Sequence, residues 1–142
     1  MESLQVTETD IARHLQTLKA AEQSWILLNR VAKPDLKGLA FVRALQAQTC
    51  AALGRMDESK QYLDKLMQLL HSRRAEMTLD DPRSIMRALA MLMQGQEDDD
   101  AGRADLAQQN YRHALDIAEH DAKSDAALVW AIHQKIGKMQ RR

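Results

Sequence analysis

Apolar residues recur at intervals of three and four along almost the whole chain, and this spacing constrains the fold more than any other feature of the sequence. Such a spacing aligns apolar side chains along one face of an α-helix. In the first such stretch they are Ile11, Leu15, Leu18, Ala21, Trp25 and Leu28. The five glycines, two prolines and 4% aromatic residues are too few for an all-β chain, which needs frequent turns and aromatic strands. The sequence therefore predicts an all-α protein.

Interruptions of this spacing predict about six helices joined by short turns. Pro34 is expected to end the first helix and Gly54 the second, and Asp81-Pro82 is expected to open the fourth. The predicted helices span residues 10–33, 35–53, 57–70, 82–97, 104–120 and 124–138. Short connections between successive helices predict three antiparallel helical hairpins.

Length and charge exclude several classes of protein. The 142 residues suit a single domain. Twenty Lys and Arg balance twenty Asp and Glu, so no net field attracts nucleic acid or an anionic membrane. No apolar run approaches the roughly 18 residues of a membrane span, and residues 1–10 lack the apolar core of a signal peptide. These features predict a cytoplasmic protein with no nucleic-acid partner and no membrane span, in which the lone Cys50 is a buried, inert thiol.

The strongest internal similarity links two segments that each contain a Gly-Arg pair. Residues 52–59 read Ala-Leu-Gly-Arg-Met-Asp-Glu-Ser, and residues 100–107 read Asp-Ala-Gly-Arg-Ala-Asp-Leu-Ala. A partial third copy surrounds Gly137. The three glycines lie 48 and then 35 residues apart. We expect Gly54 and Gly102 to adopt a positive φ in a turn between two helices, because glycine does so without steric cost.

The residues after each Gly-Arg pair extend the similarity. The second copy continues with Ala107, Tyr111, Ala114 and Leu115, and the first copy has Ser59, Leu63, Leu66 and Met67 at the same positions. This order resembles the second half of a tetratricopeptide repeat, a helical hairpin with a period of about 34 residues. The resemblance implies an α-solenoid in which Ser59, Ala107 and Ala114 are buried against the preceding helix. The longer 48-residue spacing predicts longer helices or a loop inserted near residues 72–82.

The resemblance also implies a division of the single domain, residues 1–142. Residues 1–34 form an N-terminal helix, 35–81 a first hairpin, 82–122 a second hairpin and 123–142 a C-terminal capping helix. The first helix of each hairpin lines a concave groove for a partner protein. The candidate partner-binding residues are Phe41, Ala44, Gln48, Leu89, Leu92 and Gln96.

The groove expected from the resemblance is mostly apolar. Some members of the family clamp a C-terminal carboxylate with Lys and Asn, and Ala44 and Gln48 replace those residues here. An apolar groove suits an amphipathic helix or an extended apolar segment of the partner. The family's first-helix positions (Trp, Leu-Gly and Tyr) fall instead on Met91, Gln94-Gly95 and Asp98.

No pattern in the sequence indicates catalysis, so we predict no catalytic residues, no cofactor and no metal site. The chain has no phosphate-binding loop and no nucleophile motif. His113, Asp116 and His120 share one helix face but lack a fourth metal ligand, so we interpret them as exposed polar residues. The acidic run 97–100 does not fit a calcium loop, because Ala101 and Gln108 occupy ligand positions. It is interpreted as a solvated cap of the next helix or an acidic contact patch.

Two functional hypotheses follow from the helix at 82–97, which is apolar nearly all round over residues 85–93. Such a helix is either buried between its neighbours or covers a partner. The first hypothesis is a non-enzymatic scaffold, adaptor or chaperone that binds an apolar segment of another protein. The alternative is a self-associating regulatory protein, a homodimer formed through this helix and Trp25 or Trp130.

Overall fold

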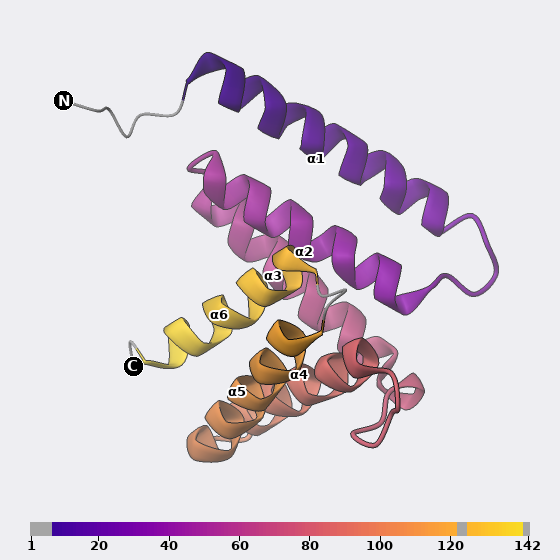
Figure 1. Cartoon of the computed structure of the whole chain (residues 1–142), viewed down its shortest axis with the longest axis vertical. Helices are drawn as coiled ribbons and strands as arrows, with labels where there is room; N and C mark the ends of the chain where they lie inside the picture. Colours follow the sequence, from indigo (N-terminus) through magenta and orange to yellow (C-terminus); the bar gives the residue numbers. More distant parts are fainter. Residues whose placement is uncertain (1–6, 122–124, 141–142) are drawn as a thin grey trace.

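The computed structural model describes residues 7–121 and 125–140, and over these residues the protein is all-α with no strand. The six helices are α1 (Glu8–Leu28), α2 (Leu36–Ala52), α3 (Met56–Ser72), α4 (Ser84–Asp100), α5 (Ala104–His120) and α6 (Ala126–Gln140), and a 3₁₀ turn, η1 (Arg74–Glu76), follows α3. Figure 1 shows α1 crossing one end of the molecule and α4 and α5 lying at the other end.

The α2–α3 and α4–α5 pairs are helical hairpins of equal dimensions. All four helices have 17 residues, and every boundary of the second hairpin lies 48 residues after its counterpart in the first. The internal similarity of the sequence therefore corresponds to a structural repeat. The extra length of the 48-residue spacing lies mainly in the connection that runs from Arg73 through η1 to Arg83, as the inserted loop expected near residues 72–82.

Both hairpins turn with the same hydrogen bonds. Gly54 has φ 77° and Gly102 has φ 80°, and each follows the last residue of its helix by two positions. The amide of Arg55 donates to the Cys50 carbonyl at 2.8 Å, and the amide of Arg103 donates to the Asp98 carbonyl at 2.8 Å. This bond across six residues, together with a positive φ, defines a Schellman C-cap. The predicted turns at both glycines are confirmed.

Small residues allow the two helices of each hairpin to approach closely. Ser59, Ala107 and Ala114 are buried, as the sequence predicts. The Ser59 hydroxyl donates to the Ala47 carbonyl of the facing helix at 2.7 Å. A Cβ atom added at Gly95 would lie 2.6 Å from ring carbons of Tyr111, so α4 accepts this aromatic side chain only because it has glycine there.

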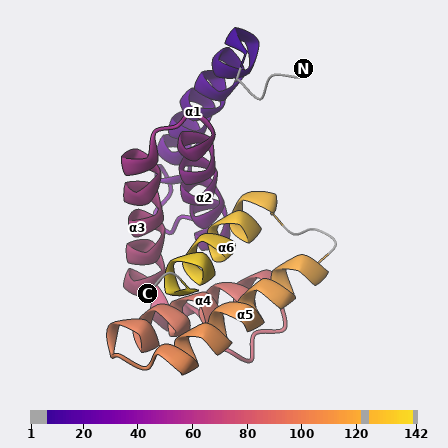
Figure 2. The ribbon, with the colours of Figure 1, turned by 90° about the vertical axis from the view of Figure 1, so that its left-hand side faces the viewer.

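The two hairpins are not stacked in parallel. In Figure 2, α2 and α3 stand upright whereas α4 and α5 run across them, and α6 lies between the two pairs. α6 packs against both α2 and α5, and direct packing between the hairpins is confined mainly to a small contact of α3 with α4. One apolar cluster includes residues of α2, α3, α4, α5 and α6, so the two hairpins and α6 share a continuous core.

α1 is attached to this core mainly through α2. Its N-cap is Thr7, whose hydroxyl accepts a hydrogen bond from the Asp10 amide at 3.1 Å. Ala21 is the only buried residue of α1. The guanidinium of Arg43 in α2 stacks on the Trp25 ring, 3.5 Å from its centroid. Such a cation–π contact fixes α1 over α2 with little apolar burial.

Several helix boundaries differ from those the sequence predicts. α1 ends at Leu28, well before Pro34, and the amide and the side chain of Asn29 both donate to the Trp25 carbonyl at this end. α4 continues to Asp100 rather than ending at residue 97.

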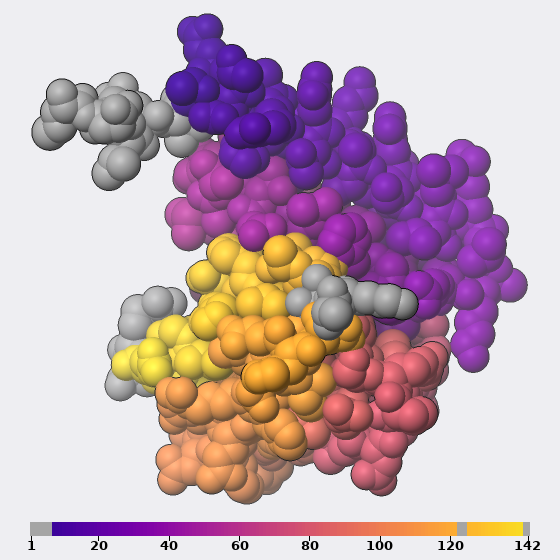
Figure 3. Space-filling view, viewed as in Figure 1, coloured from indigo at the N-terminus to yellow at the C-terminus, as the bar shows by residue number. Residues whose placement is uncertain are grey.

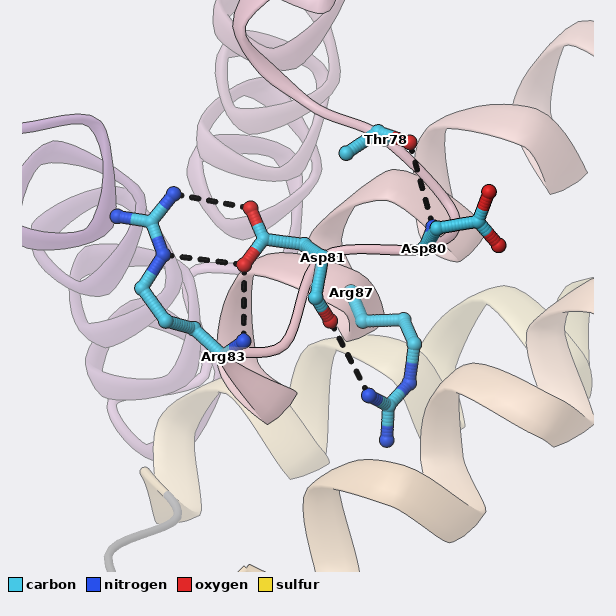
Figure 4. A network of polar contacts seen from close by, with 5 residues as sticks. All are labelled: Thr78, Asp80, Asp81, Arg83 and Arg87. Atoms are coloured by element: carbon cyan, nitrogen blue, oxygen red, sulfur yellow. Dashed lines mark hydrogen bonds and ion pairs between the residues drawn. The ribbon is translucent and has the colours of Figure 1, made fainter.

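α4 begins at Ser84 rather than at residue 82, because the Asp81 carboxylate binds the residues just before the helix. It accepts from the amide of Arg83 at 2.8 Å and from its guanidinium, and Arg87 donates to the Asp81 carbonyl at 3.2 Å (Figure 4). Gly137 lies within α6 and has no positive φ, so the third copy of the repeat forms no turn.

Candidate functional site

The six residues predicted to bind a partner differ in exposure. Phe41 is 43% exposed, and Gln48 and Gln96 are half-buried. Ala44, Leu89 and Leu92 are 0–1% exposed. α2 and α4 carry all six residues, and Ala44, Leu89 and Leu92 are buried in the apolar cluster that α2 through α6 share. Of the six, the structure brings Phe41 and Leu89 to the wall of one cavity.

This cavity, of about 490 Å³, lies between α2, α4 and α6. Its walls combine apolar side chains from the three helices with charged groups at the N-termini of α2 and α6. The lining residues are Asp35, Lys37, Gly38, Ala40, Phe41, Ile85, Leu89, Asp125 and Leu128. Leu89 is therefore buried from bulk solvent but forms part of the cavity wall.

A second cavity of about 620 Å³ adjoins the first on the side of α1. It is lined by Ser24, Leu27, Leu28, Val31, Lys33, Asp35, Gly38, Phe41 and Val42. Asp35, Gly38 and Phe41 border both cavities. We call the two cavities and the Phe41 ridge between them the Phe41 groove.

Exposed apolar side chains surround the ridge. Leu27 is 57% exposed and Val31 is 58% exposed, and Phe41 lies between them and the α4 side of the groove. Large apolar side chains that line a depression and remain in water mark a binding surface more often than single scattered ones do. Phe41 is among the residues predicted from the sequence, whereas Leu27 and Val31 are not. The signal that could have found Val31 is an apolar residue in the short loop that Pro34 ends.

The N-terminal part of α2 forms the wall that the two cavities of the groove share. The Asp35 carboxylate accepts from the Gly38 amide at 3.1 Å and caps the helix. A Cβ atom added at Gly38 would lie 3.2 Å from that carboxylate and 3.4 Å from Leu28. Because residue 38 is glycine, the end of α1 can lie close to α2, and no side chain of residue 38 fills the two cavities that it lines.

Acidic caps lie at both helix N-termini in the first cavity. Asp125 accepts from the amides of Ala127 and Leu128 at 2.8 and 3.3 Å. Burial raises the pKa of the Asp125 carboxyl above its ordinary value, although these two hydrogen bonds and nearby Lys37 act in the opposite direction. The groove therefore combines an apolar surface with a partly desolvated carboxyl group at one end.

The acidic run 97–100 is not the solvated cap that the sequence suggested. All four residues lie in the last turn of α4, and Asp98 is buried. Its carboxylate accepts from Arg103 at 2.9 Å, Asn110 at 2.8 Å and Gln94 at 3.2 Å. Burial opposes its ionisation, but these hydrogen bonds outweigh burial and hold the pKa of Asp98 below its ordinary value. Asp98 therefore ties the α4–α5 turn together.

The other polar candidates show no built site. His113, Asp116 and His120 lie on the exposed side of α5, and the His120 Nδ1 atom is 2.7 Å from the Asp116 carbonyl. Across the described ranges, no group of three or more His, Cys, Asp or Glu side chains is placed to hold a metal ion. Cys50 is buried, and burial raises the pKa of its thiol.

Comparisons with known protein families, with curated proteins and with solved structures find no match to this chain. Within residues 7–121 and 125–140, no helix has the length and apolar character that crossing a membrane requires.

Proposed function

We propose that this protein is a non-enzymatic protein–protein interaction module, an adaptor or chaperone that binds an apolar helical segment of a partner in the Phe41 groove. The observation that carries the proposal is the groove itself. Two adjoining cavities flank one half-exposed aromatic side chain, and exposed Leu27 and Val31 extend the apolar surface. Aromatic anchors in such positions commonly dominate binding energy.

A helix suits the groove better than a small ligand does. The groove is an open trough on two sides of a ridge rather than one enclosed chamber, and α1, α2, α4 and α6 all border it. An amphipathic helix can place apolar side chains at i and i+4 on either side of such a ridge. The carboxyl groups of Asp35 and Asp125 lie where basic residues of the partner helix can neutralise them.

The proposed class of protein is a divergent tetratricopeptide-like repeat. Its support is local: two hairpins of equal length, identical Schellman turns at Gly54 and Gly102, and small residues at equivalent buried positions. In this proposal the inserted α6 replaces the regular stacking of successive hairpins, and the repeat serves as a scaffold for the groove.

Self-association remains a second proposal, supported by α1. Its side chains Ile11, Leu15 and Ile26 are 41%, 42% and 51% exposed. Trp25, which the alternative hypothesis placed in a dimer interface, is instead half-buried beneath Arg43. Light scattering over a range of concentrations tests this proposal, because a constant molar mass of one chain contradicts it.

Phe41→Glu tests the proposed function against a matched control. Leu106 is 47% exposed, similar to Phe41, but it lies at the start of α5 and lines neither cavity of the groove. Leu106→Glu therefore introduces the same charge on another exposed apolar residue. The two variants and the unmodified chain are used as bait in quantitative affinity capture from cells, and circular dichroism checks that all three keep their helicity.

We expect one captured protein whose recovered amount falls at least tenfold with Phe41→Glu and is unchanged with Leu106→Glu. Capture that both variants retain, or that both lose while remaining folded, contradicts binding through the Phe41 groove.

A further inference from the structure

α6 is placed as a ligand helix would be. It lies between α2 on one side and the α4–α5 hairpin on the other, and Figure 3 shows it filling the surface between them. α2 and α4 make little direct contact in the described chain. The two hairpins are thus bridged by α6, which packs on α2 of the first hairpin and on α5 of the second.

The apolar face of α6 has the pattern of a helix bound in a groove. Leu128, Ile132 and Ile136 recur every fourth residue and are 3%, 0% and 7% exposed. Ala127 and Ala131 lie beside them and are 3% and 1% exposed. Large anchors at i, i+4 and i+8 with small neighbours are the signature of a helix that inserts one face into an apolar trough.

Half of the residues that the sequence predicted for a partner share an apolar cluster with α6. Ala44, Leu89 and Leu92 belong to one apolar cluster with Leu128 and Ile132. Leu89 and Leu128 also line the same cavity of the Phe41 groove, so the trough and the groove are continuous. Three of the residues predicted to bind a partner are therefore buried in the same apolar cluster as the inward face of α6.

Charge adds a second element of recognition. Lys135 of α6 is half-buried and lines a cavity together with Asp57 and Asp64 of α3. Burial lowers the pKa of Lys135 and Lys138 acts in the same direction, whereas Asp99, Asp64 and Asp100 favour the charged form. Asp64 belongs to the first hairpin, and Asp99 and Asp100 belong to the second. A helix that occupies this trough is thus matched by a basic residue seven positions after its first large anchor.

We propose that α6 is the built-in occupant of a helix-binding trough between the two hairpins. A partner helix with the same pattern, large apolar residues at i, i+4 and i+8, small ones at i−1 and i+3 and a Lys or Arg at i+7, takes its place. This inference rests on the proposed function and names the chemistry of its partner. The α6 helix of a second copy fits the same trough and provides the probe for the experiment.

Competition with the resident helix controls the affinity. A helix tethered to its own groove has an effective concentration in the millimolar range, so an external helix binds weakly while α6 is docked firmly. Weakening the docking of α6 must therefore strengthen the binding of an external α6 peptide. A substitution on the exposed side of α6 leaves the docked state unchanged and should have no such effect.

The experiment uses the full chain and a fluorescent peptide of residues 125–140, with binding followed by anisotropy. The chain is compared in three forms: unmodified, Ile132→Ala, which truncates a buried anchor, and Gln140→Ala, which changes an exposed residue of the same helix. We expect Ile132→Ala to bind the unmodified peptide at least tenfold more tightly than the unmodified chain does. Gln140→Ala should behave as the unmodified chain. A peptide carrying Ile132→Ala should bind the Ile132→Ala chain at least tenfold more weakly than the unmodified peptide does.

Hydrogen exchange of the unmodified chain keeps the proposal testable if Ile132→Ala does not fold. The amides of α6 should exchange at least tenfold faster than those of residues 66–70 in α3, because α6 opens before the hairpins unfold. The proposal is overturned if a folded Ile132→Ala chain does not bind the peptide, or if α6 exchanges only with global unfolding. Either failure leaves Phe41-dependent capture intact, so failure of this inference is distinguishable from failure of the proposed function.

Discussion

Replacing Gly95 by Ala should destabilise the protein although it improves the helix. Gly95 lies inside α4, and a Cβ atom there would lie 2.6 Å from the Cδ1 and Cε1 atoms of Tyr111. Carbon atoms pack favourably at about 3.5–4.0 Å, so the ring or the helix must move by roughly 1 Å. Tyr111 is 0% exposed, so its ring has no open space into which it can move.

The magnitude follows from two opposing effects. Ala in place of Gly within a helix ordinarily stabilises by about 1 kcal/mol. Overpacking a close-packed core costs roughly 1–3 kcal/mol, and contact with a rigid aromatic ring favours the upper part of that range. We therefore expect the free energy of unfolding to fall by about 1–2 kcal/mol in Gly95→Ala, measured by urea denaturation followed by circular dichroism.

The first hairpin supplies the compensating change. At the positions 48 residues earlier it has Ala47 and Leu63 instead of Gly95 and Tyr111. Gly95→Ala combined with Tyr111→Leu recreates that pair in the second hairpin. The double variant should be more stable than the sum of the single changes predicts, by at least about 1 kcal/mol. A Gly95→Ala protein as stable as the parent, or a double variant that is simply additive, refutes the close packing of Gly95 on Tyr111.

Three further changes test the hairpins by the same denaturation assay. Gly54→Val should lower the free energy of unfolding by at least about 1 kcal/mol, because φ is 77° there, and a neutral effect contradicts the turn. Ala107→Leu should cost roughly 1–3 kcal/mol, because Ala107 is fully buried; a stable variant would show spare room between α4 and α5. Asp98→Asn should lower the free energy of unfolding at neutral pH, and this free energy should then decrease less below about pH 4 than it does in the parent protein. The pKa of Asp98 is lower in the folded state than in the unfolded state, so ionised Asp98 stabilises the fold at neutral pH, and this stabilisation is lost as the pH falls through the folded-state pKa. Equal loss of stability in acid for the parent and for Asp98→Asn contradicts this assignment.

The hairpins could be predicted from the sequence because their determinants are local. The turn at Gly54 needs only a residue that tolerates positive φ, and the small residues at Ser59 and Ala107 report a close approach between neighbouring helices. These features act within a few tens of residues. They therefore leave a readable pattern with the same order in both copies.

The exposure of the groove could not be predicted, because it depends on a helix distant in sequence. The pattern of residues 85–93 allows either burial or a binding face, and the structure shows the segment buried on nearly all sides. Leu89 and Leu92 are buried in an apolar cluster to which α2, α3, α5 and α6 also contribute. Nothing in the local spacing of α4 specifies which later helix packs on it.

The composition of the Phe41 groove was only partly visible for the same reason. Phe41 follows from its place on the first helix of a hairpin. Val31 and Asp125 join it from a loop and from a helix N-terminus, where no periodic pattern applies. The sequence predicts Asp98 as part of a solvated cap, because its hydrogen-bond partners Arg103 and Asn110 lie beyond the turn and reach it only in the folded hairpin.

The most direct test of the account is photo-crosslinking in cells with a photoreactive phenylalanine analogue at position 41 or, as the control, at position 106. Both parent residues, Phe41 and Leu106, are exposed to a similar degree, so each probe is equally accessible. Binding through the Phe41 groove predicts a discrete cross-linked polypeptide from position 41 and none from position 106. Cross-linking at position 106 but not at position 41, or at neither position, would contradict the account.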